Sequence, residues 1–152
     1  MKDLGELKYF LGIEFARSKQ GILMHQRNYA LELISELRLS AAKPCATPLD
    51  TNDILTIKEY DDHCKNDSQL ADEPLADINS YQRLIGKLLY LTMTRFDISF
   101  SVQTLSQFLQ QPKKSHMEAA MRVVKYVKSQ PGRGILLSSS TNNNITAYCD
   151  AD

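Results

Sequence analysis

Adjacent carboxylates at Asp61 and Asp62 are the first side chains in this sequence that suggest chemistry. They directly follow Tyr60, an order close to the aromatic-x-Asp-Asp turn in which two carboxylates bind divalent metal ions. The spacer residue of that turn is missing here, and no hairpin pattern surrounds the three residues. His63 and Cys64 come next, but a zinc site needs two further ligands and none lies at a suitable spacing. We therefore expect no metal site in this stretch.

The three cysteines of the 152-residue chain form no recognisable disulfide or zinc pattern. Cys45, Cys64 and Cys149 are odd in number, far apart and outside any C-x-x-C pair, so we expect reduced thiols. No segment approaches the roughly 20 apolar residues of a membrane-spanning helix. The N-terminus contains Asp3 and Glu6 and lacks the apolar run of a secretory signal. We expect an intracellular chain without a membrane partner, and its compartment stays open.

A net charge of zero hides two segments of opposite charge. Residues 50–80 carry nine acidic side chains against two lysines, a net charge of −7. Residues 81–137 carry nine basic side chains against Asp97 and Glu118, a net charge of +7. A basic segment joined to an acidic one is typical of proteins that handle nucleic acids, but an ordinary solvated helix surface gives the same counts.

Three amphipathic helices are predicted between residues 80 and 132, where apolar residues recur three or four positions apart. The stripes are Leu84, Ile85, Leu88 and Leu91; Ile98, Val102, Leu105 and Leu109; and Ala120, Val123, Val124 and Val127. Ser115 and Glu118 predict a capping box at the start of the third helix, and Pro131-Gly132 predicts its end. We expect these helices to organise the rest of the chain.

The N-terminal part predicts a β-hairpin followed by a helix. Side chains between residues 7 and 26 alternate as strands do, with a turn over Ser18–Gly21. Gly12 inside the first strand predicts a bulge or a close approach by another group. A helix is expected from Asn28, as N-cap, to about Leu39, and it should pack against the hairpin.

Regular periodicity is absent from residues 51–79, which are acidic and contain few large apolar side chains. Such a stretch buries too little surface to offset about 1 to 2 kcal/mol of backbone entropy per residue, so we expect a flexible linker. Gly134–Leu137 predicts a short strand, and alternation from Ile145 predicts another that ends at Asp150. The whole pattern predicts an α+β fold, with a hairpin and helix, an acidic linker, three basic helices and short C-terminal strands.

The helical segment shares a run of motifs with one family. SYQRLIGKLLYLTMTRFDISF, residues 80–100, resembles the reverse transcriptase of copia-type retrotransposon Pol polyproteins in its tyrosine, arginine, leucine-x-glycine, tyrosine-leucine-threonine and threonine-arginine-x-aspartate-isoleucine positions. KYFLGIEFARSKQGILMHQRNYA, residues 8–30, and the proline pairs at Pro44 and Pro48 extend the resemblance over nearly the whole chain. Phe96 stands where the family has proline, which should weaken the start of the second helix by up to about 1 kcal/mol.

The resemblance also implies a division of the chain. Residues 1–43 would be the hairpin and helix that follow the reverse transcriptase palm, 44–79 the acidic linker, 80–132 thumb-like or connecting helices, and 133–152 the start of a ribonuclease H-like domain. We expect the polymerase aspartates to precede Met1 and the other ribonuclease H acids to follow Asp152.

Two kinds of site residue follow from the same resemblance. Phe10, Leu11 and Gly12 would belong to a hairpin that grips the primer strand, although an apolar hairpin that only packs is an open alternative. Asp150 would be one ribonuclease H metal ligand and catalytic acid, because a tyrosine-x-aspartate ends the first strand of that domain.

Basic side chains complete the predicted nucleic-acid-binding set. Arg122 and Lys125 are expected on the outer face of the third helix, and Arg95 precedes the second helix. Such side chains would contact phosphates and read no bases, so binding would be independent of sequence and steeply dependent on salt.

A single aspartate cannot hold the pair of Mg²⁺ ions that both activities of the parent family use. We therefore expect a polyprotein fragment that is catalytically inactive and needs no cofactor by itself. A free-standing basic nucleic-acid-binding module and a truncated piece of an active RNA-directed DNA polymerase are the alternatives. The expected partners are an RNA–DNA hybrid or template–primer and the remainder of the Pol polyprotein.

Overall fold

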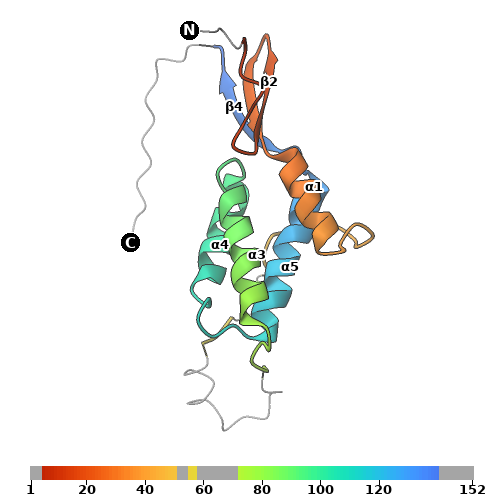
Figure 1. Cartoon of the computed structure of the whole chain (residues 1–152), viewed down its shortest axis with the longest axis vertical. Coiled ribbons are helices and arrows are strands. Elements are labelled where there is room, and N and C mark those ends of the chain that lie inside the picture. Colours follow the sequence, from red (N-terminus) through yellow and green to blue (C-terminus); the bar gives the residue numbers. More distant parts are fainter. Residues whose placement is uncertain (1–4, 51–54, 58–71, 141–152) are drawn as a thin grey trace.

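Four strands and several helices make up the described part of the chain. The computed structural model describes residues 5–50, 55–57 and 72–140 (Figure 1). The elements are β1 (Tyr9–Phe10), β2 (Ile13–Ser18), β3 (Gly21–His25), α1 (Arg27–Glu36), α3 (Ile78–Leu91), the 3₁₀ turn η1 (Phe96–Ile98), α4 (Ser99–Ser106), α5 (Lys114–Ser129) and β4 (Gly134–Ser138). The sheet stands at one end of the helices in Figure 1. The predicted α+β class is confirmed.

The predicted hairpin is confirmed as β2 and β3, which pair in antiparallel register from Ser18 opposite Gly21 to Glu14 opposite His25. A fourth strand joins them, because β4 pairs with β3 and places Gly134 opposite His25. The resemblance assigned residues 133–152 to a following domain. In the structure, β4 of this stretch pairs with β3 of the hairpin, and the domain division stays a prediction.

The first strand is shorter than its alternation predicts, because the chain reverses at Leu11 and Gly12. Both residues have positive φ, 47° and 75°. Two successive positive φ values are what a tight two-residue hairpin turn requires. Tyr9 and Phe10 therefore form a separate strand, β1, which pairs back on Glu14 and Ile13.

Helix α1 begins two residues earlier than predicted, because its N-cap is Gln26 and not Asn28. Gln26 is the N-cap residue and makes no side-chain capping bond. The backbone N–H of Asn28 donates to Oε1 of Glu14 at 2.9 Å, so an acceptor from β2 serves the first turn of the helix. Ala30, Leu33 and Ile34 are buried, as predicted.

The predicted helical stripes form the core. Leu84, Ile85, Leu88 and Leu91 of α3, Ile98, Val102 and Leu105 of η1 and α4, and Ala120, Val123, Val124 and Val127 of α5 are all buried. Leu109 lies beyond the end of α4 and is partly buried against this core. Tyr81 is fully buried, and its hydroxyl donates to the Leu105 carbonyl at 2.8 Å, joining α3 to α4. Burial raises the pKa of the Tyr81 phenol.

The start of α5 differs from the predicted capping box of Ser115 and Glu118. The helix begins at Lys114, and the backbone N–H of Lys113 donates to Nδ1 of His116 at 3.1 Å. Ser115 donates its backbone N–H and its hydroxyl to the Asp72 carboxylate. A carboxylate at a helix N-terminus is favourable because it faces unpaired N–H groups and the positive end of the helix dipole. The cap therefore comes from a residue 43 positions away in sequence.

Much of the predicted flexible linker, residues 51–54 and 58–71, lies outside the described residues, as do Tyr60-Asp61-Asp62 and the predicted strand ending at Asp150. No helix in the described ranges combines the length and apolar character needed to cross a membrane.

Candidate nucleic-acid interface

The predicted primer-gripping residues lie at the exposed turn between β1 and β2. Phe10 and Leu11 are 56% and 70% exposed. Behind them, the hydroxyl of Tyr90, near the end of α3, donates to the Leu11 carbonyl. A Cβ atom added to Gly12 would lie 2.7 Å from Oη of Tyr90. Tyr90 thus approaches the Gly12 backbone closely, although Gly12 lies in a turn and not inside a strand as predicted.

Arg95, which was predicted to be part of the nucleic-acid-binding set, is buried. Only 2% of its side chain is exposed. Its Nε and Nη2 atoms donate to the two carboxylate oxygens of Asp97, each at 2.8 Å, and Nη1 donates to the Gln130 carbonyl at 3.0 Å. The guanidinium also lies 5.7 Å from the centre of the Tyr126 ring. Arg95 therefore joins the end of α5, through Gln130, to η1, through Asp97. These contacts already use its hydrogen-bond donors.

Asp97 gathers further donors around the same network. The Tyr126 hydroxyl donates to its Oδ2 at 2.9 Å, and Nη1 of Arg133 lies 3.4 Å from the same oxygen. Partial burial alone would raise the pKa of Asp97, but the hydrogen bonds from Arg95 and Tyr126 and the charges of Arg95 and Arg133 bring its pKa below the ordinary value. Asp97 is therefore held as a carboxylate that unites η1, α5 and the start of β4.

The two predicted binding residues on α5 lie beside the chain that follows α1. Nη1 of Arg122 lies 3.3 Å from Oδ2 of Asp50, and Nη2 donates to Oγ1 of Thr47 at 3.1 Å. Lys125 is half-buried, and its backbone carbonyl accepts the Cys45 N–H at 3.3 Å. The phosphate contacts assigned to Arg122 and Lys125 stay predictions, and in this structure a phosphate would compete with Asp50 and Thr47 for the guanidinium of Arg122.

Lys128 shows how the same face of α5 is used inside the chain. Its ammonium group donates to the carbonyls of Leu39, Ser40 and Ala42 at 3.1, 2.6 and 2.6 Å. These carbonyls follow the end of α1, where backbone acceptors lack helical partners. Part of the positive charge that the composition suggested for nucleic acid therefore stabilises a loop.

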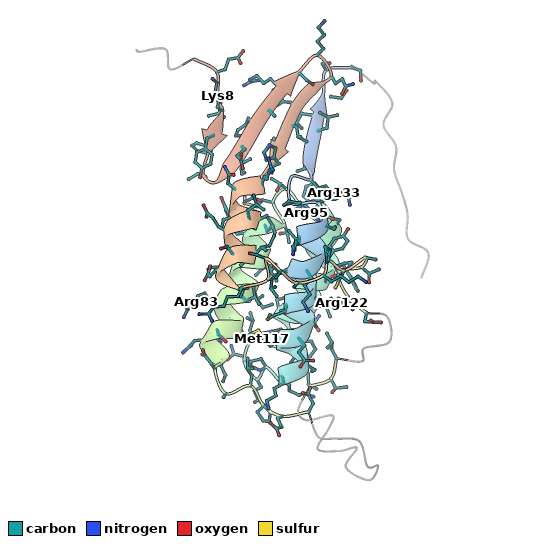
Figure 2. All side chains as sticks on the ribbon, turned by 90° about the vertical axis from the view of Figure 1, so that its right-hand side faces the viewer. Lys8, Arg83, Arg95, Met117, Arg122 and Arg133 are labelled. Carbon is teal, nitrogen blue, oxygen red and sulfur yellow. The ribbon has the colours of Figure 1, made fainter. Side chains whose placement is uncertain are left out.

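The outer face of α3 is a surface that the residue patterns did not single out. Gly86 lies in the middle of this 14-residue helix, is exposed, and a Cβ atom added there would meet nothing within 4 Å. Gln82 and Tyr90 lie one turn before and after it on the same face. Arg83 is exposed beside them and projects from the outer side of α3 in Figure 2. The signal in the sequence was a glycine inside a strongly amphipathic helix, at a position outside its apolar stripe.

This surface continues into the hairpin turn, because Tyr90 contacts Leu11 directly. Figure 2 shows Lys8, just before β1, and Arg83 along one edge of the molecule, with Arg122 and Arg133 toward the other. We call residues Phe10–Gly12, at the end of β1 and in the turn that follows it, together with Gln82, Arg83 and Gly86, the hairpin–α3 surface.

No metal centre emerges from the part of the chain that the structure describes. There, no three histidine, cysteine, aspartate or glutamate side chains are grouped so that they could hold a metal ion. Asp150, the predicted metal ligand, lies outside this part.

Comparison with known proteins shows that the whole length of this chain is similar to part of several transposon polyproteins. The chain is 36% identical over all of its residues to the retrovirus-related Pol polyproteins from transposons RE2 and RE1 of Arabidopsis thaliana. It is 33% identical over 99% of its residues to a putative transposon Ty5-1 protein of Saccharomyces cerevisiae, covering 46% of that protein. An uncharacterized mitochondrial protein of Arabidopsis thaliana is 30% identical over the whole chain, which covers 58% of it.

These relatives differ greatly in length from this chain, which spans 10% of the two RE polyproteins. No protein-family model matches the sequence, and no solved structure matches it. The similarity nevertheless extends from one end of the chain to the other in each of the three kinds of relative. Over its whole length, the chain is therefore homologous to a segment of the retrovirus-related Pol polyproteins of transposons.

Proposed function

We propose that this segment is the part of a copia-type reverse transcriptase that links the palm to ribonuclease H, and that its hairpin–α3 surface contacts an RNA–DNA template–primer. The names of the relatives support a polyprotein fragment, and the motifs of residues 8–30 and 80–100 support this particular region. The proposed contact rests on one structural observation, the exposed Gly86.

Glycine in the middle of a helix needs a reason, because it costs about 1 kcal/mol relative to alanine. At Gly86, no neighbouring group within the described chain would collide with a methyl group. Packing against the described residues therefore does not explain the absence of a side chain. The remaining physical reason is a close approach to the helix backbone from outside.

An A-form duplex suits such a surface. Its minor groove is wide and shallow and exposes 2′-hydroxyl groups and sugars, so proteins contact it largely by shape. A helix face without a side chain at Gly86 could lie close against that groove, while the exposed Arg83 would reach a flanking phosphate. The exposed apolar side chains of Phe10 and Leu11 would touch the same duplex from the adjoining turn.

Catalysis is assigned to other parts of the polyprotein. Both expected reactions use a pair of Mg²⁺ ions held by several carboxylates. Asp150 would supply only one of these carboxylates. We propose that the segment by itself neither extends a primer nor cleaves a hybrid.

Gly86→Ala separates binding from folding, because the two effects have opposite signs. We expect the variant to be more stable by about 0.5 to 1 kcal/mol, since alanine favours the helix. Its affinity for a short RNA–DNA hybrid should fall about tenfold, because the new methyl group holds the duplex away. Urea denaturation and fluorescence anisotropy with a labelled hybrid measure the two quantities.

The matched control is Gln103→Ala, at an exposed position of α4 outside the hairpin–α3 surface. It should leave hybrid affinity unchanged. Equal affinity of Gly86→Ala and the unaltered chain, in a variant that is more stable, would refute the proposed contact.

A further inference from the structure

Tyr90 occupies a junction between the sheet and the helices. It belongs to the last turn of α3, yet its hydroxyl donates to the carbonyl of Leu11, 79 positions earlier in the sequence. Leu11 lies in the turn between β1 and β2, outside the strand pairs Tyr9–Glu14 and Phe10–Ile13. The hydrogen bond therefore joins the β1–β2 turn, which we call the tip, to helix α3.

The tip is shaped to receive this hydroxyl. Gly12 has φ of 75°, and the position that its Cβ would take lies 2.7 Å from Oη of Tyr90. Any other residue at this position would need both a left-handed backbone conformation and a displaced tyrosine. Gly12 thus permits the turn and the close approach together.

The helices, and not the hairpin, fix the ring of Tyr90. The ring meets that of Tyr29 on α1 edge to face, with centroids 5.0 Å apart and planes at 75°. Tyr29 in turn donates its hydroxyl to the Lys87 carbonyl at 3.4 Å, and Lys87 forms an ion pair with Glu36. Helices α1 and α3 therefore fix the Tyr90 ring, and its hydroxyl in turn binds the β1–β2 turn.

We propose that Tyr90 is a positioning residue that keeps Phe10–Gly12 beside Gly86, so that the turn and α3 present one continuous surface to a nucleic acid duplex. The inference rests on the proposed function, since it explains how the turn and α3 keep a fixed position relative to each other in the hairpin–α3 surface. It adds a role to a residue that need not touch the duplex itself.

Tyr90→Phe tests the role with the smallest change, because it removes the hydroxyl and keeps the ring beside Tyr29. Tyr126→Phe is the matched control, since it removes a tyrosine hydroxyl that donates to Asp97 and takes no part in holding Tyr90 or the turn. In the 152-residue chain, hydrogen exchange at the amides of Phe10 and Ile13, which pair across β1 and β2, should become about two- to tenfold faster in Tyr90→Phe only, the factor expected for losing one hydrogen bond. Affinity for an RNA–DNA hybrid should fall about threefold or more in the same variant.

A second readout distinguishes positioning from general weakening of the fold. Gly12→Ala should speed exchange at the tip strongly in the unaltered chain, because the new Cβ meets Oη of Tyr90. In the Tyr90→Phe background the same substitution should have a smaller additional effect, since that atom is gone. Additive effects would count against the junction.

The outcomes remain distinct from those for the proposed function. Unchanged tip exchange in Tyr90→Phe overturns the positioning role, whatever the chain binds. Faster exchange at the tip with unaltered affinity for the hybrid also overturns the positioning role, because the position of the turn would then not affect binding. If the unaltered chain binds no hybrid, the proposed function fails and the role in nucleic-acid contact fails with it, while the exchange data still report whether Tyr90 holds the tip.

Discussion

Replacing Asp97 with asparagine should lower the free energy of unfolding by about 3 kcal/mol, the low end of the range for breaking a buried ion pair. Asparagine has the same shape and keeps one acceptor oxygen, so the substitution mainly removes charge. Arg95, with 2% of its side chain exposed, would then lie buried without its carboxylate. Asp97 itself is 18% exposed, which is why we expect the low end of the range. Urea denaturation followed by circular dichroism measures the loss.

The dependence on pH provides an internal check on this result. The folded-state pKa of Asp97 lies below its ordinary value. Its contribution to stability is therefore complete above the unfolded pKa of about 3.9 and is lost as pH falls through the lower folded-state pKa. The difference between the two proteins should be constant near neutral pH and shrink below about pH 4.

Asp50→Asn is the matched control, because Asp50 pairs with Arg122 where both side chains are about one-third exposed. It should cost less than about 1 kcal/mol, as surface pairs do. Equal losses for the two variants would show that the Arg95–Asp97 pair contributes no more than a surface pair.

Replacing Gly134 with alanine should detach β4 from the sheet and cost about 2 to 3 kcal/mol, as forced overpacking does. A Cβ atom at Gly134 would lie 2.9 Å from the Met24 carbonyl carbon and would overlap its oxygen. The clash is with backbone, so no side-chain rotation can relieve it. Faster hydrogen exchange across β3 and β4, together with a lower urea midpoint, would report the change.

Gly132→Ala, two positions earlier, is the matched control. The nearest atom to its added Cβ is Cδ of Arg27 at 3.6 Å, an ordinary contact, so stability should be unchanged or slightly higher. Slow exchange in β4 of Gly134→Ala would contradict the close pairing of β3 and β4.

The sequence was sufficient for features that depend on local periodicity. Leu84, Val102 and Val124 are buried because side chains three and four positions apart share a helix face, and this holds wherever the helix lies. The turn at Ser18–Gly21 was equally predictable, since a glycine ends a run of polar residues between alternating strands. The α+β class followed from these local patterns.

Features that depend on distant partners were missed or misread. Arg95 was a plausible phosphate contact until the fold placed Asp97, Gln130 and Tyr126 around it. The cap of α5 comes from Asp72, and the carbonyls that Lys128 binds belong to the loop after α1. Charge counts along the chain cannot show which charges are satisfied internally, because that depends on tertiary contacts.

The candidate site also combines features that the sequence could predict with features that only the fold revealed. Gly12 was recognised as a point of close approach, but nothing in the hairpin sequence identified Tyr90 as the approaching group. Gly86 was part of the motif that carried the family resemblance, yet its exposure became informative only when the structure showed open space around it. A residue kept small for an external partner looks the same in sequence as one kept small for packing.

The most direct test of the proposed interface is chemical-shift mapping of the ¹⁵N-labelled chain as an RNA–DNA hybrid is added at about 50 mM salt, where phosphate contacts are strong. The largest amide shifts should cluster at Leu11, Gly12, Arg83 and Gly86, and added salt should reverse them. Shifts confined to the α5 face around Arg122 and Lys125, or no shifts at any ratio, would contradict a duplex-binding surface on α3 and the hairpin.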